Sequence, residues 1–232
     1  MVSGAIEGAA NNGSLVWVLE RERLRRAVPD AAGGANWASE DWFCEPLIPR
    51  LGDRMRVLDL GCGAGRISRL TAPCVGHLTC VDVSGLLLDE ARENLAHLPN
   101  LDFVHTSGYS LSPLDDASFD LVYAQGVLSY LDPIAALALL DGVYRVLRPG
   151  GASYINFYTV DQPAGREYAL YIARTVAQRG RIPGSSSKPY INEQVKKMHS
   201  LVGLDVAEVI QPSSTAERET TIFVAARGAS TA

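Results

Sequence analysis

The sequence predicts an α/β fold whose mostly parallel sheet carries helices on both faces. From residue 56 onward, short apolar runs alternate with segments of helical periodicity, as successive βαβ units do. A Gly-rich turn follows the first of these runs, at the kind of strand end where open parallel sheets bind ligands. The length of 232 residues suits one such domain better than two, and a hydrophobic content of 47% is sufficient for its core.

The segment before the first strand is expected to form a helical cap. Leu15–Val28 has apolar residues at helical spacing and stops at Pro29, and Trp37–Leu51 is a second helical stretch interrupted by proline. Four large aromatic side chains in this cap either close over a substrate as a lid or simply bury the helices: Trp17, Trp37, Trp42 and Phe43.

Seven apolar runs define the expected strands. They are Arg56–Leu60, Leu78–Asp82, Leu101–His105, Phe119–Tyr123, Ala152–Phe157, Val206–Ile210 and Thr220–Ala226. Helices are expected near 65–72, 84–97 and 132–147, and over Ile191–Val202. The helix near 132–147 has clear boundaries, because Asp132 can cap its free amides, Pro133 suits its first position, and Pro149 followed by two glycines ends it.

Residues 159–190 interrupt the alternation and are interpreted as a helical insertion after strand 5. They combine a helix over Arg166–Gln178 with a turn rich in glycine and serine, and they are placed to lie over the ligand-binding edge. The predicted organisation is a single domain over 1–232, with an N-terminal helical cap at 1–55, a cofactor-binding core at 56–158, a substrate-side insertion at 159–190, and a C-terminal helix with the last two strands at 191–227.

The composition of the chain disfavours three kinds of partner: nucleic acid, metal ions and membranes. The net charge of −5 disfavours binding to nucleic acid, and the basic residues near 21–26 are interleaved with acids, as on a solvated helix face. The four cysteines show no metal-binding spacing, so no metal site is expected. No segment has the ~20 continuous apolar residues of a membrane span, and we expect a cytoplasmic protein without a membrane partner, either monomeric or homodimeric.

The Gly-rich turn is the first candidate for ligand binding. Asp59 closes the first strand, and Gly61, Gly63 and Gly65 follow at alternate positions before a helix. Glycines allow backbone amides to approach a ligand closely, and a helix N-terminus favours negative charge. The alternative is a tight turn without a ligand.

Asp82, at the end of the next strand, is the second candidate. A carboxylate there is placed to accept both ribose hydroxyls of a bound adenosine. NAD would also satisfy this geometry, but the dinucleotide fingerprint requires a third glycine three places after the second, where this chain has Arg66. The alternative for Asp82 is an ordinary cap of the following helix.

Four segments in chain order resemble the motifs of class I S-adenosylmethionine-dependent methyltransferases: Val57–Arg66, Val81–Ser84 with Ala91–Asn94, Ser118–Val122, and Arg145–Gly151. The resemblance implies a Rossmann-like, mostly parallel seven-stranded sheet, with S-adenosyl-L-methionine as cofactor and S-adenosyl-L-homocysteine as product. It also implies that Gly61 and Gly63 contact the methionyl part with Asp59 near its ammonium, that Asp82 binds ribose, and that Val83 packs on adenine.

The resemblance is weaker around adenine. Many members have an Asp-Ala pair after the third strand, where this chain has Gly108 and Tyr109. Ser107 or a backbone amide is the expected substitute, and Tyr109 can stack on the base. Gln125, just after the fourth strand, matches a position that often touches the cofactor.

The group that would remove a proton from the acceptor is not evident. Many small-molecule members place a histidine after the fourth strand, whereas Val127–Leu131 contains none. His105, His199 and Tyr130 are the remaining candidates, and each has a structural role as its alternative. Neither an Asn-Pro-Pro-Tyr sequence nor a Pro-Cys pair follows the fourth strand, so nucleic-acid bases are not the expected acceptors.

Five of the nine tyrosines fall between residues 154 and 190, where they either line an acceptor pocket or pack the insertion on the sheet: Tyr154, Tyr158, Tyr168, Tyr171 and Tyr190. The sequence therefore predicts methyl transfer to an oxygen or nitrogen of a small molecule, consistent with natural product biosynthesis. The alternatives are a non-catalytic scaffold that keeps the cofactor-binding fold and an NAD-dependent oxidoreductase.

Overall fold

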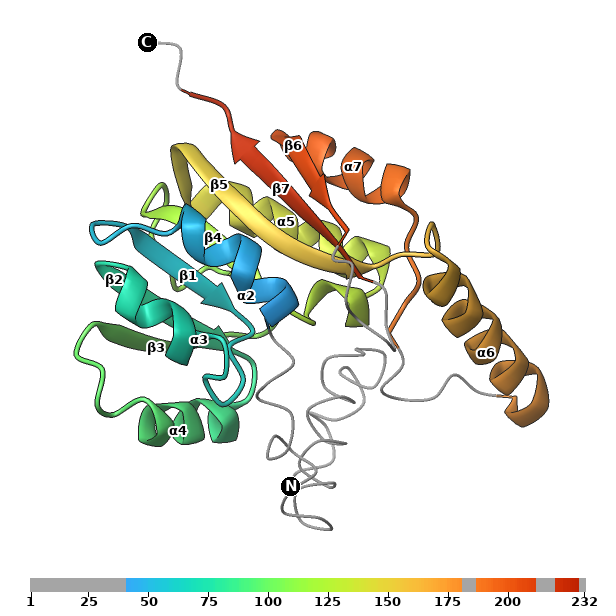
Figure 1. Ribbon diagram of the computed structural model, residues 1–232, viewed down its shortest axis with the longest axis horizontal. Helices are drawn as coiled ribbons and strands as arrows, with labels where there is room; N and C mark the ends of the chain where they lie inside the picture. The colour runs from blue at the N-terminus through green and yellow to red at the C-terminus, as the bar shows by residue number, and fades with distance from the viewer. Residues whose placement is uncertain (1–40, 181–186, 212–219, 230–232) are drawn as a thin grey trace.

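A computed structural model describes residues 41–180, 187–211 and 220–229 of the chain. They form a seven-stranded sheet in the order β3-β2-β1-β4-β5-β7-β6, with helices on both faces (Figure 1). Among the described strands, β7 alone runs opposite to the other six, which confirms the predicted mostly parallel, Rossmann-like sheet. The predicted helix Leu15–Val28, together with Trp17 and Trp37, lies outside the described residues.

The strands agree closely with the apolar runs of the sequence. They are β1 Arg56–Leu60, β2 His77–Asp82, β3 Leu101–His105, β4 Phe119–Ala124, β5 Leu147–Tyr158, β6 Leu204–Ile210 and β7 Thr220–Arg227. Strand β5 begins five residues before its predicted start, so the proline and glycines at 149–151 lie within it. Gly151 permits this irregular start, because a Cβ there would lie 3.0 Å from the carbonyl oxygen of Asp120 in β4.

The described helices are α2 Asp41–Leu47, α3 Ser68–Thr71, α4 Gly85–Asn94, α5 Pro133–Val146, α6 Pro163–Arg179 and α7 Asn192–Leu201, with 3-10 turns η2 Ile48–Arg50, η3 Ala72–Cys74 and η4 Leu128–Tyr130. Asp132 caps α5 as predicted, accepting hydrogen bonds from the amides of Ile134 and Ala135. Ser84 caps α4 by accepting from the amide of Leu87. None of the described helices is both long and apolar enough to span a lipid bilayer.

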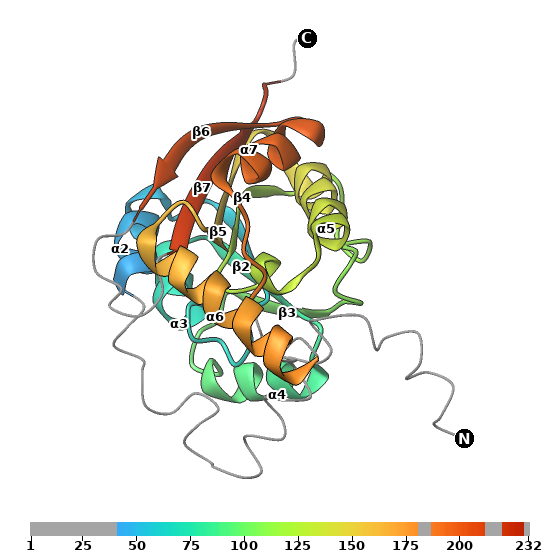
Figure 2. The same cartoon turned by 90° about the vertical axis from the view of Figure 1, so that its right-hand side faces the viewer.

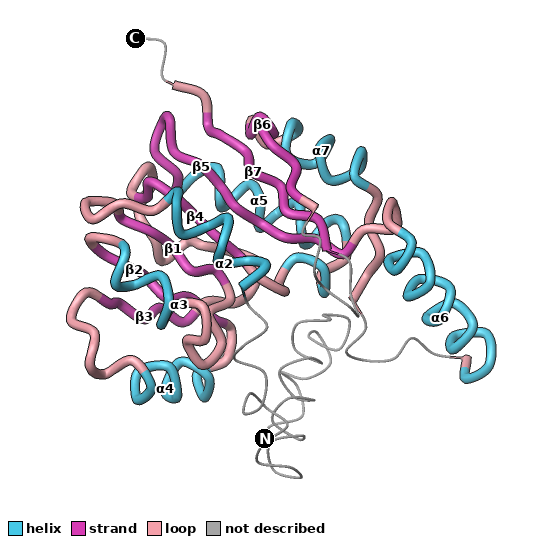
Figure 3. The backbone as a smooth tube through the Cα atoms, viewed as in Figure 1, coloured by secondary structure: helices cyan, strands magenta, loops and turns pink. Residues whose placement is uncertain are grey.

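Two apolar cores lie on opposite faces of the sheet. Buried side chains of α5 and α7 pack on one face, and those of α2, α3 and α4 pack on the other (Figure 3). Helix α6 differs, because Thr175 is its only buried residue. Figures 1 and 2 both show α6 extending away from the sheet, in the place predicted for an insertion after β5.

The strand order sets the place of the site. The chain moves from β1 outward to β2 and β3 and then returns to β4 on the other side of β1. Such a reversal opens a crevice at the carboxyl ends of β1 and β4, which is where open α/β sheets bind ligands. The loops that follow β1, β2 and β4 meet at this edge.

Candidate functional site

The turn after β1 requires glycine for steric reasons. Gly61, Gly63 and Gly65 all have positive φ, at 79°, 56° and 85°. A Cβ at Gly61 would lie 2.2 Å from Cγ2 of Val127, and a Cβ at Gly65 would lie 2.6 Å from Cδ1 of Leu95. The missing side chains therefore leave room for Val127, in the loop that follows β4, and for Leu95, at the end of α4.

Asp82 fixes this turn to the end of β2. Its Oδ2 accepts a hydrogen bond from the Gly63 amide at 2.8 Å, and its Oδ1 accepts one from the Ser84 amide at 2.9 Å. The Val81 carbonyl accepts from the amides of Gly61 and Cys62. A carboxylate has about four acceptor sites, so Asp82 can hold the loop and bind hydroxyl groups of a ligand at once.

Asp59 lies beneath the same turn and is almost completely buried. Its Oδ2 accepts hydrogen bonds from Ser68 Oγ at 2.6 Å and from Tyr123 Oη at 2.9 Å. Burial raises the pKa of Asp59 to about 7, against the lowering effect of these two hydrogen bonds, and the charge of Asp82 adds to the rise. A cation placed nearby would oppose this effect and favour the charged carboxylate.

The third strand brings the other predicted residues to this edge. The Thr106 amide donates to the Asp82 carbonyl, so Ser107, Gly108 and Tyr109 begin beside Asp82, and Tyr109 is exposed. His105 is exposed as well, and its Nε2 donates to the Val83 carbonyl at 2.9 Å. This contact places His105 beside Val83, at the β2–β3 end of the edge.

On the other side of the crevice, Gln125 follows β4. Its Oε1 accepts a hydrogen bond from the guanidinium of Arg66 at 3.2 Å, which ties the turn after β1 to the loop after β4. Asn156, in β5, was not among the residues that the sequence predicted for the site. It is fully buried, its Oδ1 accepts from the Gly126 amide at 2.7 Å, and its Nδ2 has no hydrogen-bond partner in the described part of the chain. Only the pairing of β4 with β5 brings Asn156 to the loop.

His199 does not reach the crevice, which corrects that expectation. Its ring is fully buried against those of Phe157 and Phe223, and its Nδ1 donates to the Val195 carbonyl at 2.8 Å. Burial lowers the pKa of His199, so the ring packs as a neutral side chain in the core on the α7 face of the sheet. Among the residues that the structure describes, no group of three His, Cys, Asp or Glu side chains is placed to hold a metal ion.

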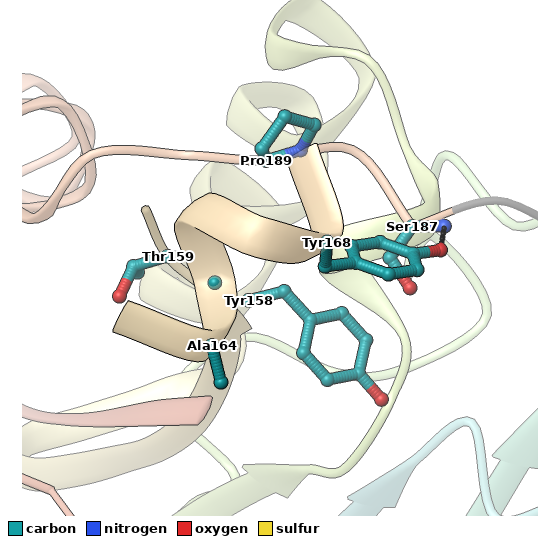
Figure 4. Close-up of a pocket in the computed structure, with 7 residues that line it drawn as sticks. Tyr158, Thr159, Ala164, Tyr168, Ser187 and Pro189 are labelled. Carbon is teal, nitrogen blue, oxygen red and sulfur yellow. Dashed lines mark hydrogen bonds between the residues drawn. The ribbon is translucent and has the colours of Figure 1, made fainter. Parts of the chain in front are cut away.

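The five tyrosines separate into three environments, so neither pocket lining nor packing on the sheet applies to all of them. Tyr154 and Tyr190 are buried, and their hydroxyls donate to the carbonyls of Phe43 and Leu131. Tyr171 is exposed on α6. Tyr158 and Tyr168 line a cavity at the start of α6 (Figure 4). Tyr130 adjoins this cavity, because its ring meets that of Tyr158 edge to face, with centroids 6.5 Å apart.

A known protein family matches the segment from β1 into β5. Residues 57–151 match the family described as Methyltransferase domain. A demethylmenaquinone methyltransferase from Clavibacter sepedonicus is 34% identical over 146 residues, which cover 61% of this chain and 58% of the relative. The chain therefore spans less than two thirds of that relative's length.

Solved structures extend the likeness to nearly the whole fold. An S-adenosylmethionine-dependent methyltransferase from Methanosarcina mazei has a TM-score of 0.63 and 22% identity, covering 79% of this chain and 98% of its own. The [4+2]-cyclase SpnF has a TM-score of 0.71 and 16% identity, covering 94% and 97%. One fold thus carries proteins named for different reactions.

Proposed function

We propose a function from the premise that this chain belongs to the class I S-adenosylmethionine-dependent methyltransferases, whose domain it carries at residues 57–151. The proposed reaction is transfer of a methyl group from S-adenosylmethionine to an oxygen or nitrogen of a small molecule. The observation that carries the proposal is the contact between Asp82 and the Gly63 amide, because it joins the two candidate binding elements at the crevice between β1 and β4.

The residues of the crevice suit the parts of the cofactor. The backbone at Gly61 and Gly63 would lie against the methionyl chain, and the loop after β4, whose Val127 packs against Gly61, would border it. Asp59 would lie near the ammonium group, and Asp82 would accept the ribose hydroxyls. The adenine would lie against Val83, with further contacts from Ser107, Gly108 and Tyr109, while Gln125 would border the methionyl side.

Positioning accounts for much of the chemistry. When bound, the cofactor supplies a methyl group already activated on a sulfonium. A lone pair on the acceptor attacks the methyl carbon as the carbon–sulfur bond breaks, and S-adenosylhomocysteine remains. The protein must hold that lone pair in line and exclude water. An alcohol would also have to lose its proton, and the candidates are Tyr130, in η4 of the loop after β4, and His105, at the end of β3.

The acceptor is proposed to be a small molecule. The name of the Clavibacter sepedonicus relative, a demethylmenaquinone methyltransferase, supports an organic small molecule as acceptor. It does not indicate whether oxygen, nitrogen or carbon is methylated in this protein. Asp and Glu outnumber Lys and Arg by 26 to 21, so the chain has no excess of positive charge to attract a phosphate backbone. This balance favours a small-molecule acceptor over a nucleic acid. We also propose that this methyl transfer is a step of natural product biosynthesis.

Calorimetric titration with S-adenosylhomocysteine tests the donor site. We expect binding near micromolar strength and at least roughly a tenfold loss in Asp82→Asn, which removes a charged acceptor of hydroxyl groups. Asp89→Asn is the matched control, because Asp89 is an exposed carboxylate on α4 that pairs with Arg92. Absence of binding to the intact protein would refute the proposal.

Transfer itself needs a second measurement. Protein that binds the cofactor is incubated with methyl-labelled S-adenosylmethionine and a panel of phenols, alcohols and amines. Label in any acceptor supports the enzyme, whereas binding without transfer to any acceptor favours the non-catalytic scaffold. Tighter binding of NADH than of S-adenosylhomocysteine would instead favour the oxidoreductase.

A further inference from the structure

Asn156, near the end of β5, carries a buried polar group that the described part of the fold does not use. The side chain is fully buried, and its Oδ1 accepts a hydrogen bond from the Gly126 amide at 2.7 Å. Its Nδ2 has two N–H donors and no hydrogen-bond partner among the described residues. Because a buried donor without a partner lowers stability, this nitrogen points to a ligand that accepts from it.

The contact with Gly126 fixes the orientation of this side-chain amide. A backbone N–H can only donate, so the atom that meets it must be the oxygen of Asn156 and not the nitrogen. The oxygen and nitrogen of an amide are bonded to the same carbon, which places Nδ2 at most about 5.3 Å from the Gly126 nitrogen. The unused donor therefore lies beside the loop after β4, which packs against the glycine turn through Val127.

Strand register places Asn156 in line with the glycine turn on one face of the sheet. Neighbouring strands bring together a row of three residues on this face, namely Asp59, Tyr123 and Tyr154. Side chains alternate along a strand, so residues two positions further on continue on the same face. The next row, at the carboxyl ends of β1, β4 and β5, is Gly61, Gln125 and Asn156.

These two rows suit the two charged groups of the methionyl part. Under the proposed function, Asp59 lies near the ammonium group and Asp82 holds the ribose at the end of β2. The carboxylate is bonded to the same carbon as the ammonium group, so it lies close to the row of Gly61. Strands β1 and β5 are two strand spacings apart, about 10 Å, and β4 lies between them. A carboxylate directed away from the ribose therefore approaches Asn156.

We propose that Asn156 binds the carboxylate of the methionyl part of the cofactor, with Nδ2 donating to a carboxylate oxygen while Oδ1 holds Gly126. This inference rests on the proposed function, because it assumes a donor site at the crevice between β1 and β4. A carboxylate that leaves water requires such donors, and hydrogen bonds to a charged acceptor are among the stronger ones. The alternative, a brace for the loop after β4, accounts for Oδ1 but leaves Nδ2 without a role.

The test compares two ligands by calorimetric titration at pH 8. One is S-adenosylhomocysteine, and the other is its decarboxylated form, which keeps the adenosine, the sulfur and the ammonium group. We expect S-adenosylhomocysteine to bind more tightly to the unchanged protein. In Asn156→Leu the ratio of the two affinities should fall at least roughly tenfold, because one hydrogen bond to the carboxylate is lost. A loop brace would instead weaken both ligands by the same factor and leave the ratio unchanged.

Asn100→Leu is the matched control. Asn100 precedes β3, at the opposite edge of the sheet from the crevice, and its Nδ2 donates to the carbonyls of Ala72 and Val75 at 2.9 Å. Its replacement removes an asparagine amide with a structural role and should leave the ratio of affinities as it is in the unchanged protein.

If Asn156→Leu does not fold, Asn156→Asp provides the same comparison. Aspartate keeps an oxygen for the Gly126 amide but replaces the donor with a negatively charged oxygen, so the preference for S-adenosylhomocysteine should again be lost. Equal affinity of the unchanged protein for the two ligands, or an unchanged ratio in the Asn156 variant that folds, would overturn the assignment. Failure of the proposed function is distinguishable, because neither ligand would then bind to the unchanged protein.

Discussion

Replacement of Asp59 by asparagine should stabilise the cofactor-free protein while weakening its donor site. The ordinary pKa of an aspartate is 3.8, and burial raises that of Asp59 to about 7. The folded state therefore binds a proton that the unfolded state releases between these values. Stability should fall as pH rises from about 4 to about 7 and stay at its reduced level above that range.

The size of this loss of stability follows from the difference between the pKa of Asp59 in the folded and unfolded states. A tenfold change in proton affinity corresponds to about 1.4 kcal/mol, so raising the pKa from 3.8 to about 7 corresponds to about 4 kcal/mol of destabilisation at pH 8. Asparagine keeps an oxygen that can accept from Ser68 and Tyr123 but carries no charge. Asp59→Asn should recover up to about 4 kcal/mol in the free energy of unfolding at pH 8 and little at pH 4.

Urea unfolding at several pH values between 4 and 8, without cofactor, measures this difference. Asp89→Asn is the control, because Asp89 is exposed and its replacement should not change the pH dependence. Calorimetry on the same variants should show that Asp59→Asn binds S-adenosylhomocysteine at least roughly tenfold more weakly, since the ammonium group loses its counter-charge. Equal or lower stability of Asp59→Asn at pH 8 would refute the reasoning.

Three further substitutions test other parts of the structure. Gly61→Ala should lower affinity for S-adenosylhomocysteine at least roughly tenfold, because its Cβ would collide with Val127 at a positive φ, and Val127→Ala in the same chain should recover part of the loss by calorimetry. Asn156→Leu leaves the Gly126 amide without its acceptor and should cost about 1–3 kcal/mol by urea unfolding. Because burial lowers the pKa of His199 below its ordinary 6.5, the protein should lose stability as pH falls through about 6.5, and His199→Phe should lack this loss in thermal unfolding.

Local patterns in the sequence were sufficient to predict the glycine turn after β1 and its neighbour Asp82. The spacing of Gly61, Gly63 and Gly65 reflects steric limits set within a few residues, and Asp82 ends an apolar run that is recognisable as a strand. Parallel strands place such ends at one edge of the sheet, so the meeting of the glycine turn with Asp82 could be predicted.

Contacts between distant segments explain what the sequence did not predict. Asn156 reaches Gly126 only because β5 pairs with β4, and neither residue carries a local signal of that pairing. His199 faces the core because of the rotation of α7, although histidine is compatible with either a core or a cleft.

The tyrosines show most clearly the difference between what the sequence predicts and what only the tertiary structure decides. Their clustering between residues 154 and 190 was visible in the sequence, and it indicated a surface rich in aromatic rings. Which of them are buried and which line a cavity depends on strand register and on where α6 begins, because a side chain's surroundings are set by the elements packed against it. By itself, the sequence determined the fold class and the position of the glycine turn. The tertiary structure decided which tyrosines are buried and which line the cavity at the start of α6, because those surroundings come from segments distant in the chain.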